Sequence, residues 1–270
     1  WSSDVCSSDL YTRIVNGLPV QVSLSVNEKI DRFKKKLFGK SYIARTTLAA
    51  MRGTVIHSHI NLILDDIINK RTVSFIDNNK KIISELRKRP EFNDATDDFM
   101  ELDAVKYTIL RKYVQGLVSE IQNKDKNAII RTEQIVYDPI KDVAGSVDML
   151  VLYSDGSVGI YDFKSMRFSY KSNELGLIKQ ISRKQKEHWG LQLTEYAKIL
   201  CQSYNIPATK IREVRNLPIE LSYNNIESGK AYNTQITSII VNQPHLAPVP
   251  AVIERTGKES LDKVLERLYD

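Results

Sequence analysis

The sequence contains few cysteines and no long apolar run. Its 270 residues include only Cys6 and Cys201, which excludes a disulfide framework and any site built from four thiolates. A metal site in this chain must therefore use carboxylates and histidine. No apolar run approaches the roughly 20 residues that span a bilayer, and the N-terminus lacks the charged and then apolar layout of a secretory signal. We expect a soluble cytoplasmic protein with no membrane partner.

Internal repeats, low-complexity tracts and obvious linkers are also missing from the sequence. A chain of this length with 42% hydrophobic residues can bury the core of a full domain. Residues 1–10 (WSSDVCSSDL) resemble the translation of a sequencing adapter, so we expect them to be a non-native leader. The expected division is this leader, an N-terminal helical segment over 11–51 and the main domain over 52–270.

The hydrophobic pattern changes period along the chain. From Asn27 to about Glu120 the spacing is helical, for example in the stripe Ile56, Ile60, Ile63 and Ile67 and in the stripe Tyr107, Leu110, Val114, Leu117 and Ile121. Strand-like patterns follow at 128–137, 146–153, 158–164 and 213–222, with helical patterns at 188–204 and 258–269. This order predicts an α/β fold with a small central sheet.

The most informative segment is a predicted hairpin whose strands are Ser146–Tyr153 and Val158–Lys164. A two-residue turn would place Asp148 on the face away from Asp162, because a shift of one residue flips the face. A three-residue loop, with Gly156 in the left-handed conformation, places the two aspartates opposite each other. We predict the three-residue loop because it also pairs Leu150 with Ile160 and Leu152 with Val158, which gives one apolar face.

Two carboxylates this close repel unless a cation or a proton lies between them. Hard oxygen ligands favour Mg²⁺ or Mn²⁺, so we predict that Asp148 and Asp162 bind such an ion. Lys164 follows Asp162 by two residues and shares its face. The alternative is that Asp162 and Lys164 form an exposed pair on an ordinary strand, since Asp-x-Lys occurs in many unrelated proteins.

Other candidate site residues lie on the flanking elements. His57 falls at the edge of a helical stripe, where an imidazole can bind a metal, although a lone histidine there is more often a packed core residue. Gln192 and Tyr196 are four apart and share a helical face, where packing is the alternative role. Glu133 on the entering strand could add an acid, but an exposed glutamate is the default there.

These residues appear in an order that resembles the PD-(D/E)XK nuclease superfamily, in its RecB-like and CRISPR-adaptation-nuclease-like branch. The elements of the resemblance are His57, Glu133, Gly145-x-x-Asp148, Asp162-x-Lys164 and Gln192-x-x-x-Tyr196, within about 52–204. The resemblance implies a restriction-endonuclease-like core with a small mixed β-sheet flanked by helices. It also implies a deoxyribonuclease that depends on Mg²⁺ or Mn²⁺.

The resemblance also implies a role for each matching residue. His57, Asp148, Asp162 and the backbone carbonyl of Phe163 would bind the metal. Lys164 would position the attacking water and offset charge on the phosphate. Gln192 and Tyr196 would hold DNA and the lysine, with Glu133 as a further catalytic acid.

The sequence departs from the pattern of this family in two ways. Many members of this branch carry four cysteines for an iron-sulfur cluster, which this chain cannot form. We therefore expect a cluster-free exonuclease of the kind found in phage or in replication, recombination and repair systems. No Gly-x-x-x-x-Gly-Lys-Ser/Thr motif is present, so unwinding of DNA would need a helicase or recombination partner. A homo-oligomer is compatible with the same expectation.

A basic segment at 165–187 separates Lys164 from Gln192. Its cations include Arg167, Lys171, Arg183 and Lys184, with aromatic residues between them. It is equally compatible with a clamp that contacts the phosphates of linear or single-stranded DNA and with a solvated surface loop. The formal net charge of +6 favours polyanionic partners but decides little by itself.

Two other classes of function remain open. The chain could be a catalytically inactive nucleic-acid-binding module of the same fold. Intact Asp148, Asp162 and Lys164 argue against that reading, because loss of catalysis would permit them to drift. It could also be a structural or interaction protein in which the polar trio is incidental.

Overall fold

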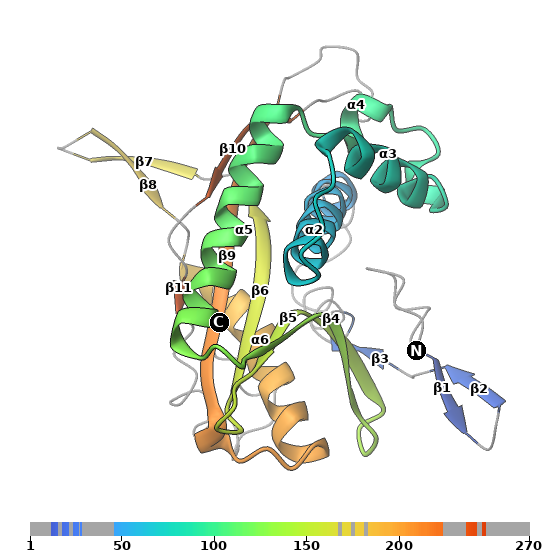
Figure 1. Ribbon diagram of the computed structural model, residues 1–270, viewed down its shortest axis with the longest axis vertical. Helices are drawn as coiled ribbons and strands as arrows, with labels where there is room; N and C mark the ends of the chain where they lie inside the picture. The colour runs from blue at the N-terminus through green and yellow to red at the C-terminus, as the bar shows by residue number, and fades with distance from the viewer. Residues whose placement is uncertain are drawn as a thin grey trace.

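The computed structural model describes residues 12–15, 18–21, 24–26, 28, 46–166, 169–173, 176–180, 183–223, 236–241 and 245–246. Its helices are α2 (Thr46–Ile68), α3 (Phe75–Leu86), α4 (Asp97–Met100), α5 (Ala104–Lys124) and α6 (Arg183–Ser203), with 3-10 turns at Pro90–Phe92 and Ala208–Lys210. Its strands are β1 (Thr12–Val15), β2 (Leu18–Gln21), β3 (Leu24–Ser25), β4 (Ile129–Asp138), β5 (Val143–Leu152), β6 (Val158–Met166), β7 (Ser169–Asn173), β8 (Gly176–Gln180), β9 (Ile211–Tyr223), β10 (Ile236–Val241) and β11 (His245–Leu246). Figure 1 shows their arrangement.

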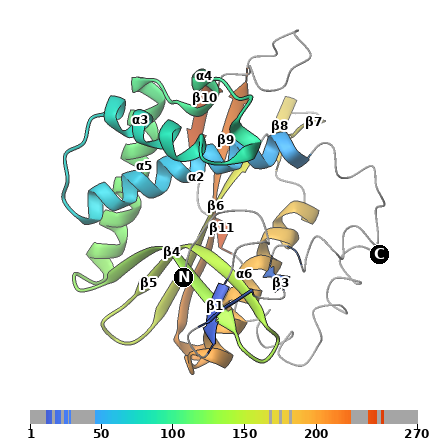
Figure 2. The same ribbon diagram turned by 90° about the vertical axis from the view of Figure 1, so that its right-hand side faces the viewer.

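A mixed sheet of seven strands organises the molecule. Its main order is β10-β9-β6-β5-β3, with β4 paired to β5 and β11 paired to β9. The pairs β6–β9 and β3–β5 are parallel, and the others are antiparallel. Helices α2 and α5 lie on one side of the sheet and α6 lies on the other (Figure 2). The predicted α/β fold, with a mixed central sheet flanked by helices, is confirmed.

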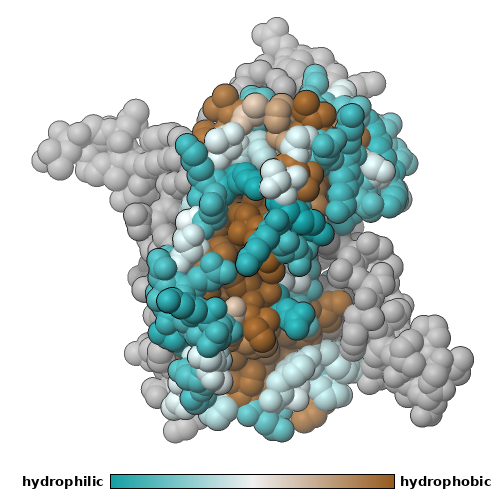
Figure 3. All heavy atoms as spheres, viewed as in Figure 1, coloured by the Kyte–Doolittle hydropathy of each residue, from teal (hydrophilic) through white to brown (hydrophobic). Residues whose placement is uncertain are grey.

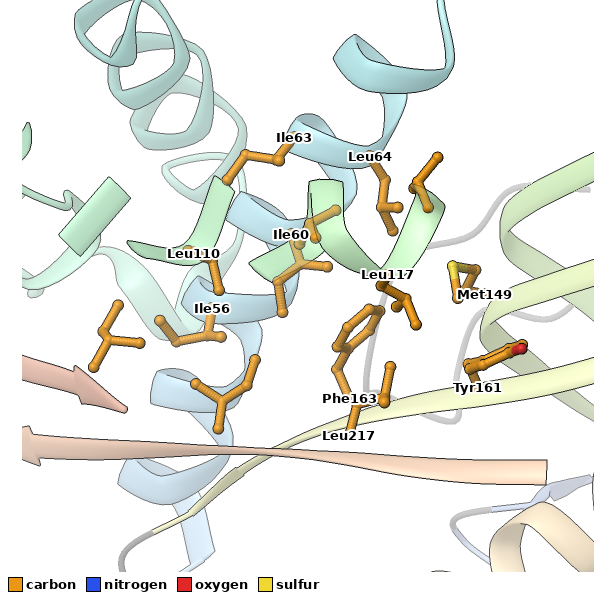
Figure 4. Close-up of a cluster of buried hydrophobic side chains, with 14 of the residues drawn as sticks. Ile56, Ile60, Ile63, Leu64, Leu110, Leu117, Met149, Tyr161, Phe163 and Leu217 are labelled. Atoms are coloured by element: carbon orange, nitrogen blue, oxygen red, sulfur yellow. The ribbon is translucent and has the colours of Figure 1, made fainter. Parts of the chain in front are cut away.

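Two buried clusters fix the helices on the sheet. The first joins α2 and α5 to side chains of β5, β6 and β9, among them Phe163 and Leu217 (Figure 4). Both predicted helical stripes lie in this cluster, with Ile67 only partly buried. The second cluster joins Leu193 and Tyr196 of α6 to Leu150 and Ile160 of the hairpin strands. Consecutive residues of β6 therefore face different helices, as expected for the alternation along a strand.

A third buried cluster lies away from the sheet. Met51 and Val55 of α2 pack there against α3 and α4, so α2 is buried along two stripes. Capping residues define where the neighbouring helices begin, because side chains of Ser74 and Asp103 accept the backbone N–H groups of Asp77 and Lys106.

The expected N-terminal helical region is present from Thr46 onward, in α2 to α5. Within the segment 11–51 that we expected to be helical, residues 12–25 contain strands β1, β2 and β3, and most of the helical pattern that begins at Asn27 lies outside the described residues. Two short apolar runs flank Asn16-Gly17, which is a typical hairpin sequence, and the helical pattern of the sequence begins only later, at Asn27. The expected boundary at residue 52 falls inside α2.

Some other boundaries also differ. Helix α6 begins at Arg183, five residues before the predicted start, and the basic segment contains the hairpin β7–β8. The leader over 1–10 and the closing helix over 258–269 lie outside the described residues.

None of the described helices is both long and apolar enough to cross a membrane. On the face drawn in Figure 3, hydrophilic residues flank a strip of apolar ones.

Candidate metal centre

The β5–β6 hairpin has the predicted register. Its loop closes with Tyr153 N–H donating to Ser157 O at 2.9 Å and Gly156 N–H donating to Tyr153 O at 3.0 Å. Gly156 has a φ of 77°, as a three-residue loop requires. Leu150 pairs with Ile160 and Leu152 with Val158, so the predicted pairing is confirmed.

The two strands separate where this register would bring Asp148 opposite Asp162. Backbone pairing between β5 and β6 extends to Met149 and Tyr161. Beyond that pair, Asp148 Oδ2 accepts the backbone N–H of Phe163 at 2.7 Å. The Asp148 carboxylate thus accepts a backbone N–H of β6 at the point where the two strands stop pairing. We call this point the fork. Further along β5, the same edge pairs with β3 at Val143 and Ala144.

Three potential metal ligands converge beside the fork, and we call them the donor group. They are His57 on α2, Glu133 on β4 and Asp148 on β5, and one ligand atom from each lies within 4.8 Å of the others. His57 Nδ1 and Asp148 Oδ2 are 3.5 Å apart, beyond the usual length of a hydrogen bond. A nitrogen and two carboxylates at this spacing fit the coordination preferences of Mn²⁺ and Mg²⁺.

Glu133 enters the donor group through an unusual backbone conformation. It falls opposite Asp148 in the β4–β5 register, between the pairs Thr132–Met149 and Gln134–Val147. Its φ is 48°, in the left-handed region that costs a residue with a side chain about 1–2 kcal/mol. Such strain is common at functional sites.

Two neighbours hold the Glu133 carboxylate in place. Asn61 donates its side-chain amide to Oε1, and Ser146 donates its hydroxyl to Oε2 at 2.7 Å. Asn61 lies one helical turn after His57 on α2, so the same helix face supplies a ligand and the support for another. Neither Asn61 nor Ser146 was predicted as a site residue, although the four-residue spacing from His57 was a usable signal for Asn61.

Asp162 stands outside the donor group and belongs to a second set, which we call the lysine cluster. Lys164 Nζ donates to Asp162 Oδ1 and to Gln192 Oε1, both at 2.8 Å. Gln192 Nε2 donates to the hydroxyl of Tyr196 at 3.0 Å. Helix α6 therefore holds the lysine through two residues on one face. The second oxygen of Asp162, Oδ2, is buried without a hydrogen-bond partner among the described residues.

The pKa values reflect how these charges are buried together. Burial alone would lower the pKa of His57, but the Asp148 carboxylate outweighs it and raises the pKa to about 9. Burial alone would raise the pKa of Asp148, but the His57 ring lowers it. Burial raises the pKa of Glu133, and the charge of Asp148 adds to the rise. Burial also raises the pKa of Asp162 to about 6 against the opposing charge of Lys164. The carboxylates are thus crowded, and positive charge beside them is stabilising.

The comparisons with known proteins do not add a relative. No protein-family model matches the chain, and no curated protein matches it. The fit of a metal therefore rests on the structure. The converging donor group and the unpartnered Asp162 Oδ2 both suit a hard divalent cation.

The predicted DNA-binding residues of the basic segment are placed only in part. Arg167 lies outside the described residues. Lys171 is on β7, and Arg183 and Lys184 are in the first turn of α6, where the described structure is limited to the backbone. The hairpin β7–β8 extends away from the sheet (Figure 1). The structure thus leaves their part in DNA binding as a prediction.

Proposed function

We propose that this protein is a divalent-metal-dependent deoxyribonuclease with a restriction-endonuclease-like core. One observation carries the proposal: the donor group of His57, Glu133 and Asp148 lies beside an ammonium group, Lys164, that is held by Asp162 and Gln192. Metal ligands next to a fixed cation form the combination that phosphodiester hydrolysis requires.

The donor group would hold Mg²⁺ or Mn²⁺. When bound, such an ion supplies an activated water and polarises a phosphodiester oxygen. Asp148 is fixed by the N–H of Phe163, and Glu133 is fixed by Asn61 and Ser146, so both carboxylates are oriented before an ion arrives. The Phe163 carbonyl stays a proposed ligand on the basis of the family resemblance.

Lys164 would act on the phosphate as a positioned charge. Its ammonium donates hydrogen bonds to Asp162 and Gln192, which hold it in place. Such an ammonium can orient the attacking water and offset the charge that develops on the phosphate oxygens. Gln192 and Tyr196 would keep the lysine in this position and contact the DNA.

The proposed substrate is DNA with free ends, as in an exonuclease of replication, recombination or repair. Arg167, Lys171, Arg183 and Lys184 would contact its phosphates from the basic segment. A helicase or recombination partner, or a homo-oligomer, would supply unwinding or processivity. One observation favours the alternative of an inactive nucleic-acid-binding module: Asp162 lies outside the donor group and is paired with Lys164.

Digestion of DNA tests the proposal. End-labelled linear DNA and a covalently closed circle would be incubated with the protein and Mg²⁺ or Mn²⁺, and with a chelator in parallel. We expect degradation of linear DNA that the chelator stops. Lys164→Ala should lose roughly 100- to 1,000-fold in rate, the usual effect of removing one group that stabilises the transition state. The control is Lys112→Ala, which changes an exposed lysine on α5.

The outcomes separate the candidates. Full activity in Lys164→Ala would contradict the role of the lysine. Retention of DNA in a gel without cleavage, over several metals, would favour the binding module. No effect of any metal on either activity or thermal stability would leave the structural role as the remaining interpretation.

A further inference from the structure

A short β-hairpin separates the two elements that hold the lysine cluster. It is formed by β7 and β8, which follow β6 with Lys164 and precede α6 with Gln192. In the described structure its strands pair only with each other, and the hairpin extends away from the central sheet (Figure 1). An isolated two-stranded hairpin is only marginally stable in water, so a hairpin in this position is better explained by a ligand that it binds than by a role in the core.

The two strands of the hairpin carry cations but no acid. Their sequences, SYKSN and GLIKQ, contain Lys171 and Lys179 and neither aspartate nor glutamate. A single acid, Glu174, lies in the loop between the strands, and the same basic segment supplies further cations on both sides of the hairpin. Such an excess of positive charge complements a polyanion, of which the phosphate backbone of DNA is the example that the proposed function requires.

The register places one lysine on each face of the hairpin. Tyr170 pairs with Lys179, and Lys171 pairs with Ile178. Because consecutive residues of a strand alternate between faces, position 171 lies on the face opposite to positions 170 and 179. A flat ligand surface would meet only one of these cations. A ligand that meets both must flank the hairpin on two sides, as the walls of a groove do.

The dimensions of the hairpin fit the major groove of B-form DNA. Strands of five residues are about 16 Å long, and a sheet with its side chains is about 10 Å thick. The major groove is about 12 Å wide and about 8.5 Å deep and admits a two-stranded ribbon, whereas the minor groove is only about 6 Å wide. The walls of the major groove are the two phosphate backbones, so each face of the hairpin would bring one lysine to one wall.

The hairpin is close enough to the lysine cluster along the chain to act on the same DNA. Ser169 follows Lys164 by five residues, which span at most about 18 Å, or half of one turn of B-form DNA. We propose that the β7–β8 hairpin enters the major groove beside the end that is cleaved, so that the substrate class is double-stranded DNA. This inference rests on the proposed function and names the substrate of the same site.

The groove predicts an order of affinity. A single strand has no groove, and the major groove of duplex RNA is too narrow for side chains. Fluorescence anisotropy would compare a labelled DNA duplex of about 20 base pairs, or two helical turns, with one of its strands and with duplex RNA of the same sequence. A chelator prevents cleavage. We expect the DNA duplex to bind roughly 10-fold or more tightly than the other two probes, and equal or weaker binding of the duplex would overturn the inference.

A double variant tests the two faces together. Lys171→Ala combined with Lys179→Ala removes one phosphate contact at each wall, and each contact contributes about 0.9 to the slope of log affinity against log salt concentration. The slope for duplex DNA should therefore fall by roughly 2 in this variant. The matched control combines Lys80→Ala with Lys81→Ala, which removes two exposed lysines from α3 and should keep the slope. An unchanged slope in the hairpin variant, or an equal fall in the control, would contradict the proposal. Thermal unfolding checks that both variants are folded.

The choice of groove is tested with the wild-type protein, so this test does not depend on how any variant folds. Substituents at C5 of a pyrimidine project into the major groove, and glucosylated 5-hydroxymethylcytosine therefore blocks it. A duplex with this base in place of cytosine should bind roughly 10-fold or more weakly than the unmodified duplex, whereas distamycin, which fills the minor groove, should leave binding unchanged. Equal affinity for the two duplexes, or displacement by distamycin, would rule out the major groove.

A small substrate separates this inference from the proposed function. The p-nitrophenyl ester of thymidine 5′-monophosphate has one phosphodiester and no groove, so its hydrolysis with Mn²⁺, lost in Lys164→Ala, reports the proposed chemistry alone. If the ester is hydrolysed but the hairpin variant keeps its salt slope, the proposed function stands and the hairpin inference fails. If neither the ester nor DNA is hydrolysed while the affinity order and the slope are as expected, the hairpin binds duplex DNA and the proposed function fails.

Discussion

The ring of Tyr196 fills the space where a side chain at Gly145 would begin. A Cβ at position 145 would lie 2.5 Å from Tyr196 Cε1 and 3.2 Å from Val26 Cγ2. The close approach lets α6 pack directly on β5, and Tyr196 also accepts the hydrogen bond from Gln192. Gly145 is therefore required by packing between a strand and the helix that holds Lys164.

Gly145→Ala should destabilise the protein by about 1–3 kcal/mol, the usual cost of forcing extra atoms into a packed interior. The added methyl must displace the Tyr196 ring, which also shifts Gln192 away from the lysine. Urea unfolding measures the stability, and the DNA digestion rate should fall in parallel. Gly116→Ala is the matched control, because nothing lies within 4 Å of a Cβ there and alanine favours helix α5 by about 1 kcal/mol. Equal stability of the two variants would contradict this packing argument.

The left-handed backbone of Glu133 predicts a difference between two substitutions. Glu133→Ala and Glu133→Gly both remove the carboxylate, so both should lose Mn²⁺ binding at the donor group. Only glycine adopts a φ of 48° without strain, so the glycine variant should be more stable than the alanine variant by about 1 kcal/mol. Urea unfolding of both variants measures this difference. A more stable alanine variant would show that the strand relaxes when the carboxylate is removed.

Gln192 should affect catalysis without affecting metal binding. Gln192→Leu removes the oxygen that accepts from Lys164, while the donor group is formed by residues of α2, β4 and β5 and stays intact. We expect the rate of DNA digestion to fall roughly 10- to 100-fold, typical for loss of a supporting residue, with unchanged Mn²⁺ binding at the donor group. Gln202→Leu, at the exposed end of the same helix, is the control. Loss of Mn²⁺ at the donor group in Gln192→Leu would mean that the two clusters act as one.

The hairpin could be predicted from the sequence because its determinants are local. Loop length, Gly156 and the pairing of Leu150 with Ile160 all depend on residues within one short segment, and one shifted residue would expose the apolar face. The helical stripes of α2 and α5 follow from the same kind of regular spacing.

The composition of the donor group could not be predicted in the same way. We predicted that Asp162 shares an ion with His57 and Asp148. Strands β5 and β6 separate at that point, and among the described residues the side chain that converges with His57 and Asp148 is that of Glu133. The composition of the donor group depends on where β5 separates from β6 and on the left-handed conformation of Glu133. Neither feature has a signature in the sequence.

Removal of the metal should lower the thermal stability of the protein. The donor group is formed by three separate elements, α2, β4 and β5, so the unfolded chain cannot present the same three ligands together. An ion at about 100 times its dissociation constant then stabilises the folded state by about 2.7 kcal/mol. For a chain of this size that corresponds to a melting temperature higher by roughly 5–10 °C. Thermal unfolding with Mn²⁺ and with a chelator measures the shift.

Two variants identify the origin of that thermal shift. His57→Ala removes one ligand and should abolish most of the shift, while its melting temperature in chelator reports any loss of packing by itself. Lys164→Ala should keep the shift, because the lysine is not a metal ligand, and removing its positive charge beside the carboxylates should strengthen cation binding. A shift that survives His57→Ala unchanged would place the ion elsewhere. A shift lost in Lys164→Ala would mean that the donor group depends on the lysine cluster for its geometry.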